Sequence, residues 1–164
     1  MAEITVESLL LDQLHMVYPL VREVVRRIEL REWLRFARDI ASPRHAGRSG
    51  IVVARRVGQR FPCGLFCYRT EPDLQHGMVL VADYFVALDI LDAKPIAEVL
   101  VSELAAVARR CGCEAIRSVL RNGSDDISAG LLSAGYRPES ETLRFEARIQ
   151  ICRWAGPICP GAIN

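Results

Sequence analysis

The sequence predicts an α+β fold, a mixed α/β sandwich in which a central mixed sheet of about six to seven strands carries helices on both faces. Residues 51–57, 63–69 and 78–88 have the pattern of strands with no helix between them. They are followed by a helix, a strand, a helix and a last strand. Because a long helix connects residues 78–88 to the strand at 115–120, we expect those two strands to be parallel.

The chain begins with one predicted strand and two predicted helices. Residues 3–7 alternate apolar and polar side chains, which is typical of a short strand. Asp12 is placed to cap the first helix, and Pro19 should kink or split it. The apolar residues of this helix recur at helical spacing: Leu14, Val17, Val21, Val24 and Ile28. A second helix is predicted over residues 30–40.

Loops and strands alternate in the middle of the chain. Residues 42–50 have the composition of a loop, and residues 58–62 (GQRFP) read as the connection of a hairpin. A further loop is predicted at residues 70–77. The strand at 78–88 is apolar on both faces, so we expect it in the centre of the sheet.

The remainder of the domain is predicted to pack helices against the sheet. A helix over residues 93–110 should end at Gly112, and a short helix should run from Asp125 or Asp126 to Ala134, before Gly135. Residues 142–151 alternate well enough to form a final strand. These elements give one domain over residues 1–151, followed by a tail, 152–164, that is coil or a partner contact.

Composition limits the classes of function. The 164 residues are 51% hydrophobic and 25% charged, which is typical of a globular domain with a real core. The net charge of +1 gives no sign of nucleic-acid or membrane binding. No apolar run approaches a membrane span, and the first residues lack the pattern of a signal peptide, so we expect a cytoplasmic protein.

Six cysteines are spread along the chain without CxxC spacing, and no histidine lies near one in sequence. Structural zinc sites usually use tighter pairs of ligands. We therefore predict reduced, mostly buried thiols and no metal site.

Two segments carry a resemblance to a known family. Residues 80–120 form a strand, a turn, a long helix and a strand, and residues 131–137 (LLSAGYR) close the next helix. This arrangement resembles the GNAT superfamily of N-acetyltransferases, and the likeness covers nearly the whole chain. The resemblance implies a GNAT-like acyl-CoA N-acyltransferase fold, acetyl-CoA (or CoA) as cofactor, and direct transfer of acetyl to an amine.

The resemblance also places a cofactor site where the strand at 78–88 meets the following helix. Backbone groups of Ala87, Leu88 and Asp89 would pair with the pantetheine arm. The pyrophosphate would lie on the start of the helix, a position at which free N–H groups bind anions. The corresponding window in this chain is Asp92, Ala93, Lys94, Pro95, Ile96 and Ala97. Asn122 would contact cofactor or else form a turn or helix cap.

This window departs from the family pattern. Asp92 replaces an arginine or glutamine, Pro95 replaces a glycine, and only Ala97 matches. Pro95 removes one donor, although proline is well tolerated at the start of a helix. Asp92 repels phosphate and, as a cap, would occupy the N–H groups that a phosphate needs. Lys94 acts in the opposite direction, as a cation that could hold the pyrophosphate.

The family's catalytic groups are incomplete in this sequence. Leu131 stands where many members have a tyrosine that protonates the departing thiolate, and Tyr136 is expected in the core. Asp83 is the best candidate for a general base, because a carboxylate in an apolar strand must be paired or have a raised pKa. The alternative is an Asp83 locked by an arginine of a neighbouring strand: Arg55, Arg56 or Arg69. Tyr84 is a catalytic candidate only if its side chain faces the cleft.

The second helix lines the acceptor pocket in this family. By this resemblance Trp33 and Phe36 would form part of the pocket wall, with Trp33 half in the core. The acceptor is predicted to be a small-molecule or peptide amine, with no nucleic acid or membrane partner.

Three functions remain open from the sequence. The first is a GNAT-type N-acetyltransferase. The second is a catalytically impaired GNAT-fold binding or regulatory module, which the glycine-poor turn and Leu131 would explain. The third is an oligomeric assembly protein, such as a homodimer, in which the apolar residues Trp154 and Ile158 of the tail contact a partner subunit.

Overall fold

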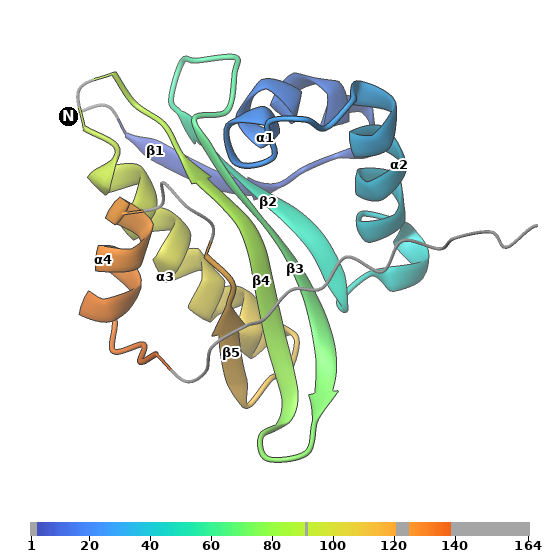
Figure 1. Ribbon diagram of the computed structural model, residues 1–164, viewed down its shortest axis with the longest axis vertical. Coiled ribbons are helices and arrows are strands. Elements are labelled where there is room, and N and C mark those ends of the chain that lie inside the picture. Colours follow the sequence, from blue (N-terminus) through green and yellow to red (C-terminus); the bar gives the residue numbers. More distant parts are fainter. Residues whose placement is uncertain (1–2, 91, 121–124, 139–164) are drawn as a thin grey trace, which may run out of the picture.

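The computed structural model describes residues 3–90, 92–120 and 125–138 (Figure 1). Within these residues one five-stranded sheet has the order β1-β2-β3-β4-β5. Its strands are β1 (Ile4–Ser8), β2 (Ser49–Arg56), β3 (Gly64–Asp73), β4 (Gly77–Ala87) and β5 (Ala115–Ser118). The described sheet therefore has fewer strands than predicted, and the predicted strand at 142–151 and the tail lie outside the described residues.

The topology of the sheet agrees with the sequence prediction. β1, β2, β3 and β4 pair successively in antiparallel fashion, whereas β4 and β5 are parallel. The parallel pair is connected by α3 (Lys94–Arg110), as such a crossover requires. The central position of β4, between β3 and β5, is confirmed.

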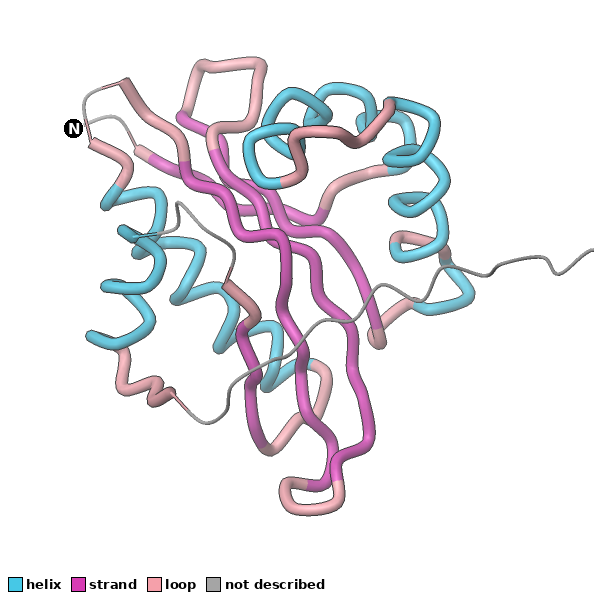
Figure 2. The backbone as a smooth tube through the Cα atoms, in the orientation of Figure 1, coloured by secondary structure: helices cyan, strands magenta, loops and turns pink. Residues whose placement is uncertain are grey.

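Helices cover both faces of the sheet (Figure 2). The short 3₁₀ helix η1 (Leu11–Val17), α1 (Tyr18–Val24) and α2 (Leu30–Ile40) pack on one face, and α3 and α4 (Asp125–Ser133) pack on the other. A further 3₁₀ turn, η2 (Pro43–His45), follows α2. Alternate residues of β2 serve the two cores: Ile51 and Val53 face α1 and α2, and Val52 and Ala54 face α3.

The first helical segment is split near Pro19, as predicted. η1 ends at Val17 and α1 begins at Tyr18, with the proline in the first turn, where its missing N–H costs little. Two details of the prediction are wrong. Leu10 rather than Asp12 precedes the first helical turn, and α1 ends before Ile28, whose carbonyl instead accepts a 2.9 Å hydrogen bond from the Tyr18 hydroxyl.

β3 is longer than the sequence predicted. Residues 70–73 were expected in a loop because they include proline and aspartate, but they continue the strand to Asp73. β2 pairs with β3 only as far as Arg69, and the N–H of Thr70 bonds to Arg48 on that side. By alternation, the nitrogen of Pro72 also faces the side that β2 has left, so its missing N–H costs no ladder bond.

Glycines follow the last turns of α3 and α4. Gly112 and Gly135 adopt left-handed backbone conformations, with φ of 67° and 93°, after α3 and α4. Both therefore end their helices as predicted.

Within the described residues, none of the helices combines the length and the apolar character needed to span a membrane.

Candidate functional site

β4 and β5 diverge partway along their length. Their pairing runs from Val79 to Ala82 on β4, and the last bond is donated by the Val119 N–H to the Ala82 carbonyl at 2.8 Å. β4 continues to Ala87, paired only with β3. Among the described residues, the edge of β4 beyond Ala82 thus has no strand partner on the β5 side. We call the region beside this edge of β4, beyond the end of β5, the V.

The predicted backbone contributors lie at the end of the V. The Leu88 N–H donates to the Cys63 carbonyl at 2.8 Å, so it points toward β3 and away from the V. By alternation the N–H and carbonyl of Ala87 point into the V. Asp89 follows, with its carboxylate ion-paired to Arg56 at the end of β2. Of these three residues, Ala87 is the one whose backbone groups are placed to meet an extended ligand.

A β-bulge interrupts β4 at Asp83 and Tyr84. Leu65 pairs with Val86 but Cys67 pairs with Asp83, so β4 contains one residue more than β3 over this stretch. Tyr84 takes up the extra length in the left-handed region, with φ of 57°, which is unusual for a residue other than glycine. The Asp83 carboxylate accepts the Tyr84 N–H at 2.7 Å and stabilises the bulge.

The bulge brings Tyr84 to a cavity of about 400 Å³ beneath α1 and α2. Its lining residues are Val21, Val25, Arg27, Ile28, Glu32, Trp33, Arg35, Phe36 and Tyr84. The Phe36 ring meets Tyr84 edge-on, with centroids 5.4 Å apart and planes at 74°. Trp33 is 1% exposed and donates from Nε1 to the Leu14 carbonyl at 2.7 Å. The structure therefore brings Tyr84, selected as a catalytic candidate, together with Trp33 and Phe36, which were predicted to form part of the pocket wall. We call this the α2 pocket.

The arginines considered as partners of Asp83 have other partners. The guanidinium of Arg55 bonds to Glu7 and Gln13, and that of Arg69 bonds to Glu71. Arg56 pairs with Asp89. The carboxylate of Asp83 accepts a hydrogen bond from the backbone of the bulge, next to Tyr84 of the α2 pocket.

The start of α3 satisfies its own backbone donors. Asp92 Oδ1 accepts the Lys94 N–H at 2.9 Å, but the N-cap residue of α3 is Ala93, so the prediction that Asp92 is the cap is wrong by one position. Pro95 has no N–H to offer. The N–H groups of Ile96 and Ala97 bond to the Ala93 carbonyl at 3.1 and 3.0 Å, and both side chains are buried in the core. An anion at this helix start would therefore have to displace Asp92, with the exposed Lys94 as the nearest cation of the window.

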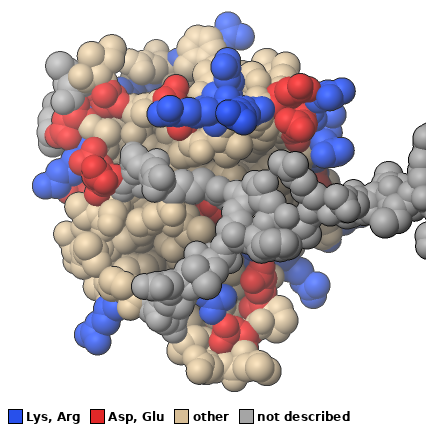
Figure 3. All heavy atoms as spheres, in the orientation of Figure 1, with Lys and Arg blue, Asp and Glu red and all other residues tan. Residues whose placement is uncertain are grey.

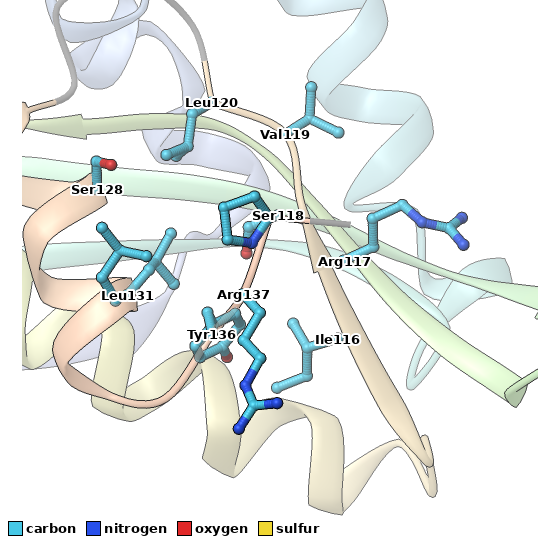
Figure 4. Close-up of a pocket in the computed structure, with 11 residues that line it drawn as sticks. Ile116, Arg117, Ser118, Val119, Leu120, Ser128, Leu131, Tyr136 and Arg137 are labelled. Carbon is cyan, nitrogen blue, oxygen red and sulfur yellow. The ribbon is translucent and has the colours of Figure 1, made fainter. Parts of the chain in front are cut away.

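A second cavity, of about 480 Å³, lies between β5 and α4 (Figure 4). Leu131 lines it and is buried, so the position of the family's tyrosine offers no proton. The hydroxyls of Ser118 and Tyr136 also lie at this cavity, buried and without a hydrogen-bond partner among the described residues. Burial raises the pKa of Tyr136. Asn122 lies outside the described residues.

The described residues carry charged side chains of both signs and several thiols. The described basic and acidic residues are interspersed over the face shown in Figure 3. The described residues include no cluster of three or more His, Cys, Asp or Glu side chains that could hold a metal ion. Cys63, Cys67, Cys111 and Cys113 are free thiols, and burial raises the pKa of each.

Known proteins match this chain in structure but not in sequence. No protein-family model matches the chain, and no curated protein matches its sequence. Solved structures do match. An aminoglycoside N-acetyltransferase in complex with CoA aligns with a TM-score of 0.75 and 11% identity, covering 90% of this chain and 97% of that chain. This chain has the GNAT fold.

Two further GNAT-like matches have different names. Glucosamine-6-phosphate N-acetyltransferase from Arabidopsis thaliana aligns with a TM-score of 0.71 and 12% identity, covering 89% of this chain and 99% of that chain. A transcriptional regulator from Bacillus halodurans aligns with a TM-score of 0.73 and 15% identity, covering 88% and 99%. At these identities the GNAT fold is shared, while the side chains of the site must be judged on their own chemistry.

Proposed function

We propose that this protein is an acetyl-CoA-dependent N-acetyltransferase that transfers the acetyl group directly to a small-molecule or peptide amine. The observation that carries the proposal is the bulge in β4, which lies beyond the last β4–β5 pair and brings Tyr84 into the lining of the α2 pocket. A cofactor arm along the V and an acceptor in the pocket would therefore meet at Asp83 and Tyr84. The CoA complex of a structural neighbour supports the choice of cofactor.

The residues around the V fit acetyl-CoA in part. The N–H and carbonyl of Ala87 suit an amide of the pantetheine arm, and Lys94 suits the pyrophosphate. The start of α3 fits less well, because its donors are bonded internally. When bound, acetyl-CoA supplies an activated thioester.

Asp83 and Tyr84 are the proposed catalytic residues. An acceptor amine loses a proton as its nitrogen forms the new C–N bond, and Asp83, or a water molecule beside it, would take that proton. The C–S bond breaks in the same transfer, and the thiolate that leaves gains a proton. The Tyr84 hydroxyl is the proposed donor, in place of the tyrosine that Leu131 replaces.

Calorimetric titration of the full chain with acetyl-CoA and with CoA, at moderate salt, tests the proposal. We expect micromolar or tighter binding, followed by release of free thiol when an acceptor amine is present. If millimolar ligand gives neither heat nor a thermal shift, the enzyme proposal fails.

A binding or regulatory module is the second candidate. The internally bonded helix start and the buried Leu131 favour it, and a structural neighbour is called a transcriptional regulator. This candidate predicts binding of acetyl-CoA or of a pocket ligand without thiol release across a broad panel of amines. Steady release with any amine would exclude it.

Homodimer formation through the tail also remains a proposal. Light scattering of the full chain and of a chain ending at Ile151 tests it. The longer chain should have the mass of a dimer and the shorter chain that of a monomer. Equal masses would count against a role for the tail.

A further inference from the structure

Two arginines at the α2 pocket have no hydrogen-bond or ion-pair partner among the described residues. Arg27, in the turn between α1 and α2, and Arg35, on α2, both line the cavity and are exposed. Neither forms an ion pair or a hydrogen bond within the described residues. Neighbouring arginines do find partners: Arg31 pairs with Glu29 at 2.8 Å, and Arg22 lies over the Tyr18 ring. Arg26 and Arg38, which lie outside the lining, also have no partner among the described residues, so Arg27 and Arg35 are distinguished by their position at the cavity.

The one acidic side chain of the described lining is already engaged. Glu32 accepts the backbone N–H of Glu29 at 2.9 Å in a capping box at the start of α2. This bond holds the carboxylate at the helix terminus, where the helix dipole stabilises it. The lining thus combines two guanidinium groups with one carboxylate, which leaves an excess of positive charge.

The other lining side chains are mainly apolar. Val21, Val25 and Ile28 form one side, and Phe36 and Tyr84 form an aromatic wall. A cavity of about 400 Å³ is large enough for a small organic molecule. An apolar interior with arginines at its border is complementary to a molecule that has an apolar body and a negative group.

We propose that the α2 pocket binds a small carboxylic acid with an apolar body, and that its carboxylate is held by Arg27 and Arg35. The planar guanidinium fork matches a carboxylate better than any other common group except phosphate. One consequence rests on the proposed function: the acceptor amine is carried by such an acid and faces Tyr84. The acceptor would then be an amine of the amino-acid type rather than a simple alkylamine.

The binding experiment needs no acetyl-CoA. The full chain is titrated calorimetrically with 3-phenylpropionate and with 3-phenylpropanamide, which share a body and differ in charge. Because hydrogen bonds to charged groups are stronger, we expect the acid to bind about tenfold tighter than the amide at low salt. Equal affinities, tighter binding of the amide, or no binding of the acid at about 10 mM, which corresponds to less than about 3 kcal/mol, would overturn the proposal.

Variants assign the effect to the two arginines. Replacing both, Arg27→Gln with Arg35→Gln, should reduce the affinity for the acid to that for the amide and leave the amide unchanged. Retained amide binding also shows that the variant is folded. Arg38→Gln is the matched control, because Arg38 lies on the same helix outside the described lining. An acid affinity that survives the double replacement contradicts the proposal.

The two proposals can fail separately. If the acid binds through the arginines but neither acetyl-CoA nor CoA binds, the acetyltransferase proposal fails and the carboxylate site stands. If acetyl-CoA binds and amines are acetylated, yet acid and amide bind equally, only the carboxylate site is refuted.

Discussion

The α2 pocket is the proposed acceptor site, and the start of α3 is the proposed pyrophosphate site. They differ in how many of their polar groups are already bonded within the protein. In the pocket, Arg27 and Arg35 have no partner within the part of the chain that the structure describes, and Tyr84 is held in a left-handed conformation. At the start of α3, Asp92 occupies the Lys94 N–H. A pocket ligand therefore gains new bonds, whereas a phosphate at α3 must first replace an existing one.

The largest expected effect is on the pocket side. Trp33→Ala removes a buried ring and leaves the Leu14 carbonyl without its donor, so we expect a loss of about 3–5 kcal/mol in the free energy of unfolding. Urea denaturation measures it. Trp33→Phe keeps most of the apolar surface and should lose less. A loss below about 1 kcal/mol in Trp33→Ala would show that the ring belongs to the pocket and not to the core.

On the cofactor side, the contact between α3 and β3 depends on a glycine. A Cβ on Gly64 would lie 2.7 Å from Ile96 Cγ2 and 2.9 Å from Leu100 Cδ1. Gly64→Ala should therefore destabilise the fold by about 1–3 kcal/mol, because it pushes α3 from the sheet. Gly130→Ala, whose Cβ would meet only Val101 Cγ2 at 3.5 Å, is the control. It should stabilise α4 by about 0.5–1 kcal/mol. Thermal unfolding of both variants tests the contrast, and equal behaviour would contradict it.

Replacing Asp92 should make the start of α3 more like the α2 pocket, with a polar group left free for a ligand. Asp92→Gly removes the carboxylate and frees the Lys94 N–H, so stability should fall by only about 0.3 kcal/mol while affinity for CoA rises several-fold. Adding Pro95→Gly, which restores a donor, should strengthen this gain. Calorimetry with CoA gives the affinity, and chemical denaturation gives the stability.

Asp92→Asn separates the two effects of the aspartate, since asparagine can still accept the N–H but carries no charge. An intermediate affinity is expected if both charge and occupancy matter. Lys94→Ala should weaken binding in every background. If Asp92→Gly leaves the affinity for CoA unchanged, the helix start is not a damaged phosphate site.

The sequence predicted the regular elements well and the site less completely. The helix at 30–40 has the bounds of α2, because apolar residues at helical spacing are a local signal. The bond from Asp92 to a backbone N–H at the start of α3 was also predicted, because aspartate before a helix is a local signal, although the N-cap itself is Ala93. The bulge was missed, because Tyr84 gives no local sign of a left-handed conformation and its strand offset depends on pairing with β3. The partnerless state of Arg27 and Arg35 likewise depends on packing, which no spacing rule reports.

The smallest expected effect concerns the closed end of the V. Asp73, at the end of β3, accepts a 2.7 Å bond from Arg117 on β5, and this bond, with backbone N–H groups of Gln75 and His76, lowers the pKa of Asp73 from 3.8 to about 2. The folded state therefore binds this proton less readily than the unfolded chain. The stabilisation is complete above pH 3.8 and is lost as the pH falls toward 2.

Arg117→Gln should return the Asp73 pKa toward 3.8, which NMR titration of the carboxyl carbon measures. In the same variant, the free energy of unfolding should fall less steeply between pH 4 and pH 2, because the contribution of one carboxyl group to that fall has been removed. The affinity of the α2 pocket for 3-phenylpropionate at neutral pH should not change, because neither Asp73 nor Arg117 lines the pocket. A parallel loss of pocket binding would mean that the closed end of the V and the pocket move together, and the two regions would then have to be treated as one.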